Sequence, residues 1–127
     1  MPSPAAALGS ALGNLVPGSR RPAVAGALRT LAYRGDNVAC PCCGGTFRSF
    51  RPHRGRAGAR CPGCGALERH RLLWLYLSQE TNLLRDGLSV LHIAPEYVLR
   101  RSLRTLGNLS YLTADLVSAL ADVHTDV

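Results

Sequence analysis

The spacing of apolar residues predicts alternating helices and strands outside a cysteine-rich segment. Residues 66–84 contain good helix formers, and Leu73, Leu77 and Leu84 recur on one helical face. Residues 88–94 form a short run rich in leucine, valine and isoleucine, which favours a buried strand. A second strand is expected at residues 109–114, and further helices are expected at residues 22–33 and 95–106.

The elements between residues 88 and 114 form a strand–helix–strand unit. Arg85-Asp86-Gly87 is a turn signal before the first strand. Pro95 suits the first turn of a helix, because a missing N–H costs nothing there, and Gly107-Asn108 is a typical helix end. A strand, helix and strand joined by short turns predict two parallel, neighbouring strands and therefore an α/β fold.

The composition limits the classes of protein that the chain can represent. It has 127 residues, of which 46% are apolar, so it can bury the core of one ordinary domain or two small ones. The longest apolar run, Leu72–Leu77, is far shorter than the roughly 18 residues of a membrane span, which excludes a membrane-spanning protein. Fifteen arginines and no lysine stand against eight acidic residues, and the net charge of +7 permits an anionic partner such as nucleic acid.

The first 35 residues carry four arginines and no acidic side chain. Ser19-Arg20-Arg21 suggests a twin-arginine export signal, but Pro22 follows, and Arg29 interrupts the apolar stretch after six residues. A transit peptide fits the charge bias better. The sequence favours a simpler interpretation, in which residues 1–35 are a flexible leader to about residue 19 and a short helix.

Five cysteines lie between residues 40 and 64, in two groups. An odd number in close clusters argues against a disulfide framework and for reduced thiolates that bind a metal. Cys40 and Cys43 form one C-x2-C pair, Cys61 and Cys64 form another, and a glycine follows each pair. Two residues between ligands let one tight turn present both sulfurs, and the glycine lets the backbone fold back. We therefore expect a zinc ribbon at residues 36–66.

The expected ligand set has consequences for the neighbouring residues. Four cysteines complete a tetrahedral zinc site and leave no position for water, so the zinc is expected to be structural. Cys42 is the surplus cysteine and is expected to be a thiol outside the site. His70 is an alternative ligand, but a solvated histidine on a helix face is the favoured interpretation. His92 is expected to be a packed histidine on its strand.

The loop between the cysteine pairs combines arginines with aromatic residues. Such a combination suits RNA or single-stranded DNA, through phosphate pairing and base stacking. Alternatively, Phe47 and Phe50 fill the small core of the ribbon while the arginines are solvated, and the sequence leaves both interpretations open. The candidate nucleic-acid residues are Arg48, Arg51, Arg54, Arg56 and Arg60.

The order of these motifs resembles a known family. It is similar to the bacterial class I S-adenosylmethionine-dependent methyltransferases that carry a zinc ribbon before the methyltransferase domain. The resemblance implies that the ribbon is followed by the opening βαβ of a Rossmann-like sheet at residues 88–127, and residues 67–87, which the apolar pattern predicts to be helical, would link the two. The stretches that carry it are CPCCGGTF at residues 40–47, CPGCGALERHRLLWL at residues 61–75, VLHIAPE at residues 90–96 and YLTADL at residues 111–116.

The resemblance also implies a cofactor site at the carboxyl ends of the two strands. The turn Ala94–Tyr97 would hold the methionine end of S-adenosylmethionine, and Glu96 would receive its ammonium group. Asp115, 21 residues after Ala94, would accept hydrogen bonds from the ribose hydroxyls, and Asp126 would meet the adenine at a third strand. The turn lacks the glycines usual in this fold, which is also compatible with a degenerate site.

The length of the chain affects the functional prediction. A class I methyltransferase core has about seven strands, so residues 88–127 are expected to be a truncated, incomplete domain that is inactive alone. The alternative is a zinc-ribbon nucleic-acid-binding or adaptor protein. The methyl acceptor is unknown, and reduced cysteines agree with a cytoplasmic protein.

Overall fold

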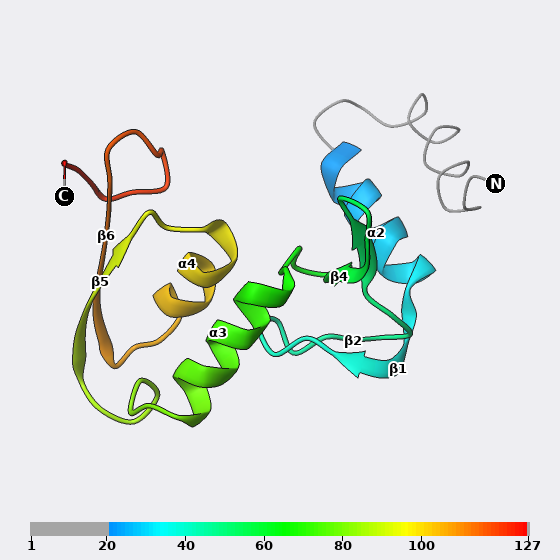
Figure 1. Ribbon diagram of the computed structural model, residues 1–127, viewed down its shortest axis with the longest axis horizontal. Helices are drawn as coiled ribbons and strands as arrows, with labels where there is room; N and C mark the ends of the chain where they lie inside the picture. Colours follow the sequence, from blue (N-terminus) through cyan, green and yellow to red (C-terminus); the bar gives the residue numbers. More distant parts are fainter. Residues whose placement is uncertain (1–20, 127) are drawn as a thin grey trace. The chain divides into compact units, whose positions relative to one another are not determined.

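The computed structural model describes residues 21–126, and for residues 21–25 it describes the backbone alone (Figure 1). The leader expected at the start of the chain lies outside the described residues. The described chain divides into two compact units of mixed α/β structure. The first unit comprises residues 21–40 and 44–65, and the second comprises residues 41–43 and 66–126.

The first unit consists of one helix and two antiparallel hairpins. The helix that the sequence predicts at residues 22–33 is present one residue earlier. In β1–β2, Ala39 pairs with Thr46, and in β3–β4, Arg51 pairs with Arg60. The elements are α2 (Arg21–Ala32), β1 (Arg34–Ala39), β2 (Thr46–Phe47), β3 (Arg51–His53) and β4 (Arg56–Arg60).

The core of the first unit is small. Its buried apolar residues are Cys40, Phe47, Ala59, Cys61 and Pro62. Of the two aromatic side chains expected in this core, Phe47 is buried, whereas Phe50 is only partly buried. A core with one large apolar side chain buries too little surface to fold a ribbon of this size by itself.

Gly35 lets two backbone segments of the first unit approach closely. A Cβ atom at this position would lie 2.7 Å from the Cβ and 2.8 Å from the Cα of Arg48. The Arg48 N–H donates to the Tyr33 carbonyl at 2.9 Å, and the Arg48 guanidinium lies 5.6 Å from the centre of the Tyr33 ring. This contact fixes the chain after β2 against the start of β1.

The second unit contains a three-stranded parallel sheet in the order β5-β6-β7. The strand–helix–strand unit expected from the sequence is present, with β5 and β6 parallel from Leu88↔Leu109 to Ile93↔Ala114. The third strand follows β6 after a short loop. The elements are α3 (Glu68–Gln79), β5 (Leu88–Ile93), α4 (Tyr97–Arg104), β6 (Leu109–Asp115) and β7 (Val123–His124).

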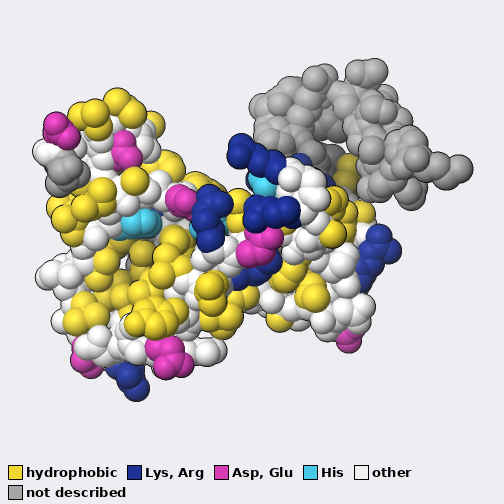
Figure 2. Space-filling view, viewed as in Figure 1, with side chains coloured by type: hydrophobic (Ala, Val, Ile, Leu, Met, Phe, Trp, Pro, Cys, Tyr) yellow, Lys and Arg dark blue, Asp and Glu magenta, His cyan; other side chains and the backbone are white. Residues whose placement is uncertain are grey.

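One face of this sheet is covered and the other is largely exposed. Helix α4 packs on β6 and buries Leu99 and Leu103. The expectation that β5 is a buried strand is wrong, because Leu91 and Ile93 are 55% and 53% exposed and the intervening residues of the strand are only half-buried. The described residues place no helix over this second face, and hydrophobic side chains cover much of the surface of this unit in Figure 2.

Helix α3 is shorter than the spacing of its leucines predicts. It ends at Gln79 instead of continuing to residue 84. The Thr81 hydroxyl donates to the Leu77 carbonyl and accepts from the Leu83 N–H, and this side-chain pairing replaces the backbone pairing of a further turn. Leu83 is consequently buried, whereas Leu84, which the sequence places on the packed face, is exposed.

A polar network fixes the segment between β6 and β7. The Asp122 carboxylate accepts hydrogen bonds from the N–H and the hydroxyl of Thr113, at 3.0 and 2.7 Å, and pairs with the Arg104 guanidinium. Thr113 is fully buried. These interactions lower the pKa of Asp122 from its ordinary 3.8 to about 2, and the hydrogen bond from the Thr113 hydroxyl has the largest effect.

Among the described residues, none of the helices has both the length and the apolar character that crossing a membrane requires.

Candidate functional site

The two cysteine pairs fold into two turns of the same design. In the first, the Gly44 N–H donates to the Cys40 carbonyl at 2.8 Å; in the second, the Gly65 N–H donates to the Cys61 carbonyl at 3.1 Å. Gly44 and Gly65 have φ angles of +71° and +79°, a conformation that side chains other than glycine rarely adopt. The glycine after each pair therefore closes the turn, as the sequence predicts.

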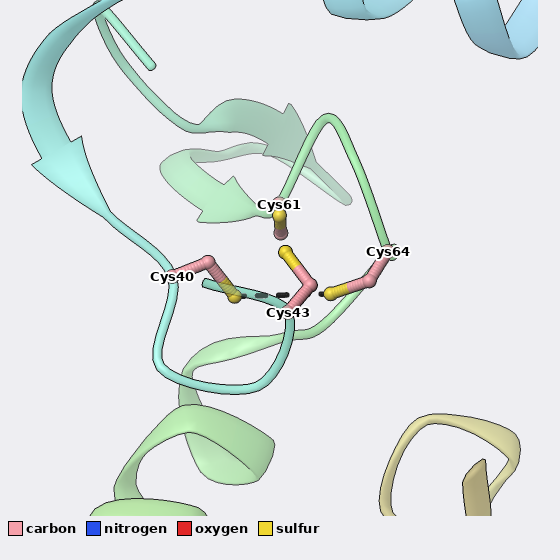
Figure 3. A group of neighbouring side chains, drawn as sticks. All are labelled: Cys40, Cys43, Cys61 and Cys64. Carbon is pink, nitrogen blue, oxygen red and sulfur yellow. Dashed lines mark hydrogen bonds between the residues drawn. The ribbon is translucent and has the colours of Figure 1, made fainter. Parts of the chain in front are cut away.

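The turns bring four sulfur atoms together (Figure 3). The four are those of Cys40, Cys43, Cys61 and Cys64, which are the ligands expected from the sequence, and all lie within 4.8 Å of one another. The sulfurs of Cys40 and Cys64 are 3.7 Å apart, which is much longer than a disulfide bond of about 2.05 Å. The four side chains point into a common space.

This geometry fits a metal ion with four thiolate ligands. In a tetrahedral site with zinc–sulfur distances of about 2.3 Å, neighbouring sulfurs are about 3.8 Å apart. The 3.7 Å between Cys40 and Cys64 corresponds to such an edge. The first cysteine of each turn is buried, at 1% exposure, whereas Cys43 is exposed and Cys64 is partly buried. The four cysteines could hold a structural metal such as zinc.

Cys42 and His70 do not belong to this group of sulfurs. The Cys42 side chain is half-buried, and its backbone carbonyl accepts a hydrogen bond from the Ser102 hydroxyl at 3.3 Å. The expectation that His70 is a solvated histidine is wrong, because its side chain is 6% exposed. Its ring is held inside the second unit by a partner that the sequence does not indicate.

That partner is Glu96, at the start of α4. The Leu67 N–H donates to His70 Nδ1 at 3.1 Å, so the neutral ring carries its proton on Nε2, which contacts the Glu96 carboxylate. The Arg69 guanidinium donates to the same carboxylate at 3.0 and 3.2 Å. Burial lowers the pKa of His70, while the negative charge of Glu96 opposes this effect. The residue expected to receive a cofactor ammonium group is thus already paired with two side chains.

The turn after β5 has an unusual backbone conformation. Ala94 has a φ of +51°, in the left-handed region that favours glycine. Its N–H donates to the Ala114 carbonyl at 2.9 Å, which ties the turn to the end of β6. The sequence shows only that glycine is absent here, and the structure shows that an alanine adopts the conformation typical of glycine.

Asp115 ends β6, beside this turn. Its Oδ1 accepts hydrogen bonds from the N–H groups of Val117 and Ser118, each at 2.9 Å. These hydrogen bonds lower the pKa of Asp115, and the one from the Val117 N–H has the largest effect. Because Ile93 and Ala114 are register partners, Ala94 directly after β5 and Asp115 at the end of β6 lie at the same edge of the sheet.

Asp126 and His92 are the remaining residues of the second unit that the sequence analysis singles out. Asp126 is exposed and follows the carboxyl end of β7. His92 is half-buried, and its Nδ1 lies 2.7 Å from the Tyr111 hydroxyl. Burial lowers the pKa of His92, and Glu96 opposes this effect. The expectation of a packed core histidine is met only in part, because His92 is half-buried and held by Tyr111.

The arginines of the ribbon are divided between structural contacts and the surface. Arg48 lies on the Tyr33 ring, whereas Arg54 and Arg56 lie at the exposed turn between β3 and β4. Arg51 and Arg60 border a hollow at the second cysteine turn, together with Arg29 of α2. Arg29 is a residue that sequence reasoning missed, because only the packing of α2 on the ribbon brings it there.

Comparison of the chain with protein-family models, with curated proteins and with solved structures finds no match.

Proposed function

We propose that the second unit is the S-adenosylmethionine-binding opening of a class I methyltransferase domain and that the ribbon before it is a structural zinc module. The observation that carries this proposal is the edge of the sheet where Ala94 and Asp115 lie side by side. In open parallel sheets, ligands bind at the carboxyl ends of the strands.

The turn at Ala94 supports this proposal through its backbone. A left-handed conformation costs a residue with a Cβ atom about 1–2 kcal/mol relative to the right-handed one. Such conformations cluster at ligand sites, where the surrounding structure maintains them. Here the hydrogen bond from Ala94 to Ala114 maintains the turn. The backbone can then approach the methionine end of the cofactor much as a glycine turn would.

Asp115 supports the proposal through its hydrogen bonding. The two N–H groups of its own loop bind Oδ1 and orient the carboxylate. The second oxygen, Oδ2, is then placed to accept from the ribose hydroxyls of a nucleoside, which is the role of acidic residues at this position in such sheets. Its lowered pKa keeps the carboxylate ionised at neutral pH, so that both oxygens act as acceptors.

Zinc is the metal that we propose for the cysteine site, because four thiolates in tetrahedral spacing are its usual structural ligands. Such a site needs reduced cysteines, so we also propose the cytoplasm as the compartment. S-adenosylmethionine would supply a methyl group from its sulfonium centre. The proposal does not specify the methyl acceptor beyond its being a nucleophile.

The test is equilibrium dialysis of the zinc-loaded protein with radiolabelled S-adenosylmethionine, using Asp115→Asn and a matched control. Asparagine keeps an oxygen for the N–H groups of Val117 and Ser118 but removes the charge. We expect binding to weaken about tenfold or more, as for the loss of a hydrogen bond to a charged group. Asp36→Asn, in β1 of the ribbon, removes the same charge and should bind like the unaltered protein. Equal binding by both variants, or no binding by the unaltered protein at millimolar cofactor, would contradict the proposal.

A further inference from the structure

A polar hollow of about 210 Å³ lies in the first unit, beside the second cysteine turn. Three arginine side chains from three different elements line it: Arg29 from α2, Arg51 from β3 and Arg60 from β4. Residues 61–65, which include the second cysteine turn, form the rest of its lining. The hollow is smaller than the roughly 300–1,000 Å³ of pockets that hold drug-sized molecules.

Two of these arginines are placed where like charges are unfavourable. Arg51 and Arg60 are direct partners across the β3–β4 hairpin, so their side chains leave the same face of the hairpin. Like charges at such positions destabilise a hairpin. Arg60 is moreover packed over the second turn, since a Cβ atom on Gly65 would lie 3.3 Å from its Nη2 atom. An anion held between the two guanidinium groups would remove this repulsion.

Acidic side chains do not provide that anion. The sequence has no aspartate or glutamate between Asp36 and Glu68. Among the described residues, no carboxylate forms an ion pair with Arg29, Arg51 or Arg60; Arg69 pairs with Glu96 and Arg104 pairs with Asp122, both in the second unit.

The metal centre does not neutralise the hollow either. Zinc with four thiolates would carry two negative charges in total, and three guanidinium groups exceed this by one. Guanidinium groups match the geometry of phosphate oxygens and bind them through paired hydrogen bonds. A polar hollow of about 210 Å³ that three arginines line suits a single phosphate group.

We propose that Arg29, Arg51 and Arg60 form a binding site for one phosphate group, taken either from a nucleic-acid backbone or as a free phosphate. This site is independent of the methyltransferase proposal, because it lies wholly within the first unit. Its ligand is recognised by charge and by hydrogen-bonding geometry, so the three arginines act together.

The test measures binding of inorganic phosphate to the zinc-loaded protein by isothermal titration calorimetry at low ionic strength. A second arm measures binding of a ten-nucleotide oligothymidylate by fluorescence anisotropy over a series of salt concentrations. The test variant is the double substitution Arg51→Gln and Arg60→Gln. The control is Arg100→Gln with Arg101→Gln, which removes the same charge from α4 of the second unit. The zinc content of every variant is measured alongside.

We expect the test variant to weaken phosphate binding about tenfold or more while it keeps its zinc, and the control to change it less than twofold. If oligonucleotide binding weakens in parallel and its salt dependence becomes shallower, the phosphate comes from nucleic acid; if phosphate binding alone weakens, it is a free phosphate. Equal weakening in test and control would overturn the proposal, since it would show a general effect of charge. Loss of zinc from the test variant with unchanged phosphate binding would also overturn it, because the arginines would then serve only to neutralise the thiolates.

Discussion

Replacing Cys61 by serine removes one of four sulfurs from a site whose geometry fits a tetrahedral metal. The side chain of Cys61 is 1% exposed, so water has no direct access to take the vacant position. Cys42→Ser is the matched control, because it makes the same chemical change one residue from a ligand. The contact of residue 42 with Ser102 uses the backbone carbonyl and survives the substitution.

The expected loss of zinc-binding free energy follows from the number of ligands. Structural zinc sites contribute about 10–16 kcal/mol at neutral pH, so an equal share for each of the four thiolates is about 3 kcal/mol. Serine is a poor ligand when protonated, and the loss corresponds to a zinc affinity about a hundredfold lower. Because the ribbon has a single large buried apolar side chain, Phe47, it should unfold when zinc leaves.

The measurement combines elemental analysis with competition against a chromophoric zinc chelator. The unaltered protein and Cys42→Ser should both carry one zinc per chain with the same affinity. Cys61→Ser should carry little zinc after exposure to the chelator, and circular dichroism should show loss of the hairpins. Equal zinc loss by Cys42→Ser and Cys61→Ser would refute the assignment of ligands. Absence of zinc from the unaltered protein, with folding unaffected by the chelator, would refute the metal site itself.

Two further predictions concern stability. Gly35→Ala should destabilise the ribbon by about 1–3 kcal/mol, since the new Cβ atom would lie within 3 Å of Arg48, whereas Gly107→Ala, where no atom lies within 4 Å, should change thermal stability little. The pKa of Asp122 is about 2 in the folded protein, below its ordinary 3.8, so its contribution is fully present above about pH 4 and is lost as the pH falls towards 2. Denaturant unfolding between pH 7 and pH 2 should show a smaller loss of stability for Asp122→Asn than for the unaltered protein. A loss of stability on acidification as large for Asp122→Asn as for the unaltered protein would disprove the role of this carboxylate.

The sulfur cluster could be predicted from the sequence because its determinants are local. Two residues between cysteines and a glycine after each pair define the turn, and the structure forms both turns in that way. The parallel pairing of β5 and β6 was also predictable, because a short strand–helix–strand segment has few other arrangements. These inferences needed no knowledge of which distant residues meet.

The errors arose where distant residues meet. The burial of His70 depends on Glu96, 26 positions further along the chain, and no periodicity indicates that pair. The exposure of Leu91 and Ile93 follows from the absence of a covering helix among the described residues, whereas a run of apolar residues predicts burial on both faces. The left-handed conformation of Ala94 could not be predicted either, because glycine is the residue that normally signals it.

The unequal exposure of the four sulfurs has a consequence for how a metal bound to them would be exchanged. Cys40 and Cys61 are buried, so a competing ligand in solution cannot reach them while the turns are closed. Cys43 is the exposed sulfur of the group. An incoming thiol or an oxidant should therefore attack at Cys43 first, and this thiolate would separate from the metal while the two buried sulfurs still hold it. The exposed Cys43 would then determine how fast the metal passes to a competing chelator, whereas all four cysteines determine how tightly it is bound.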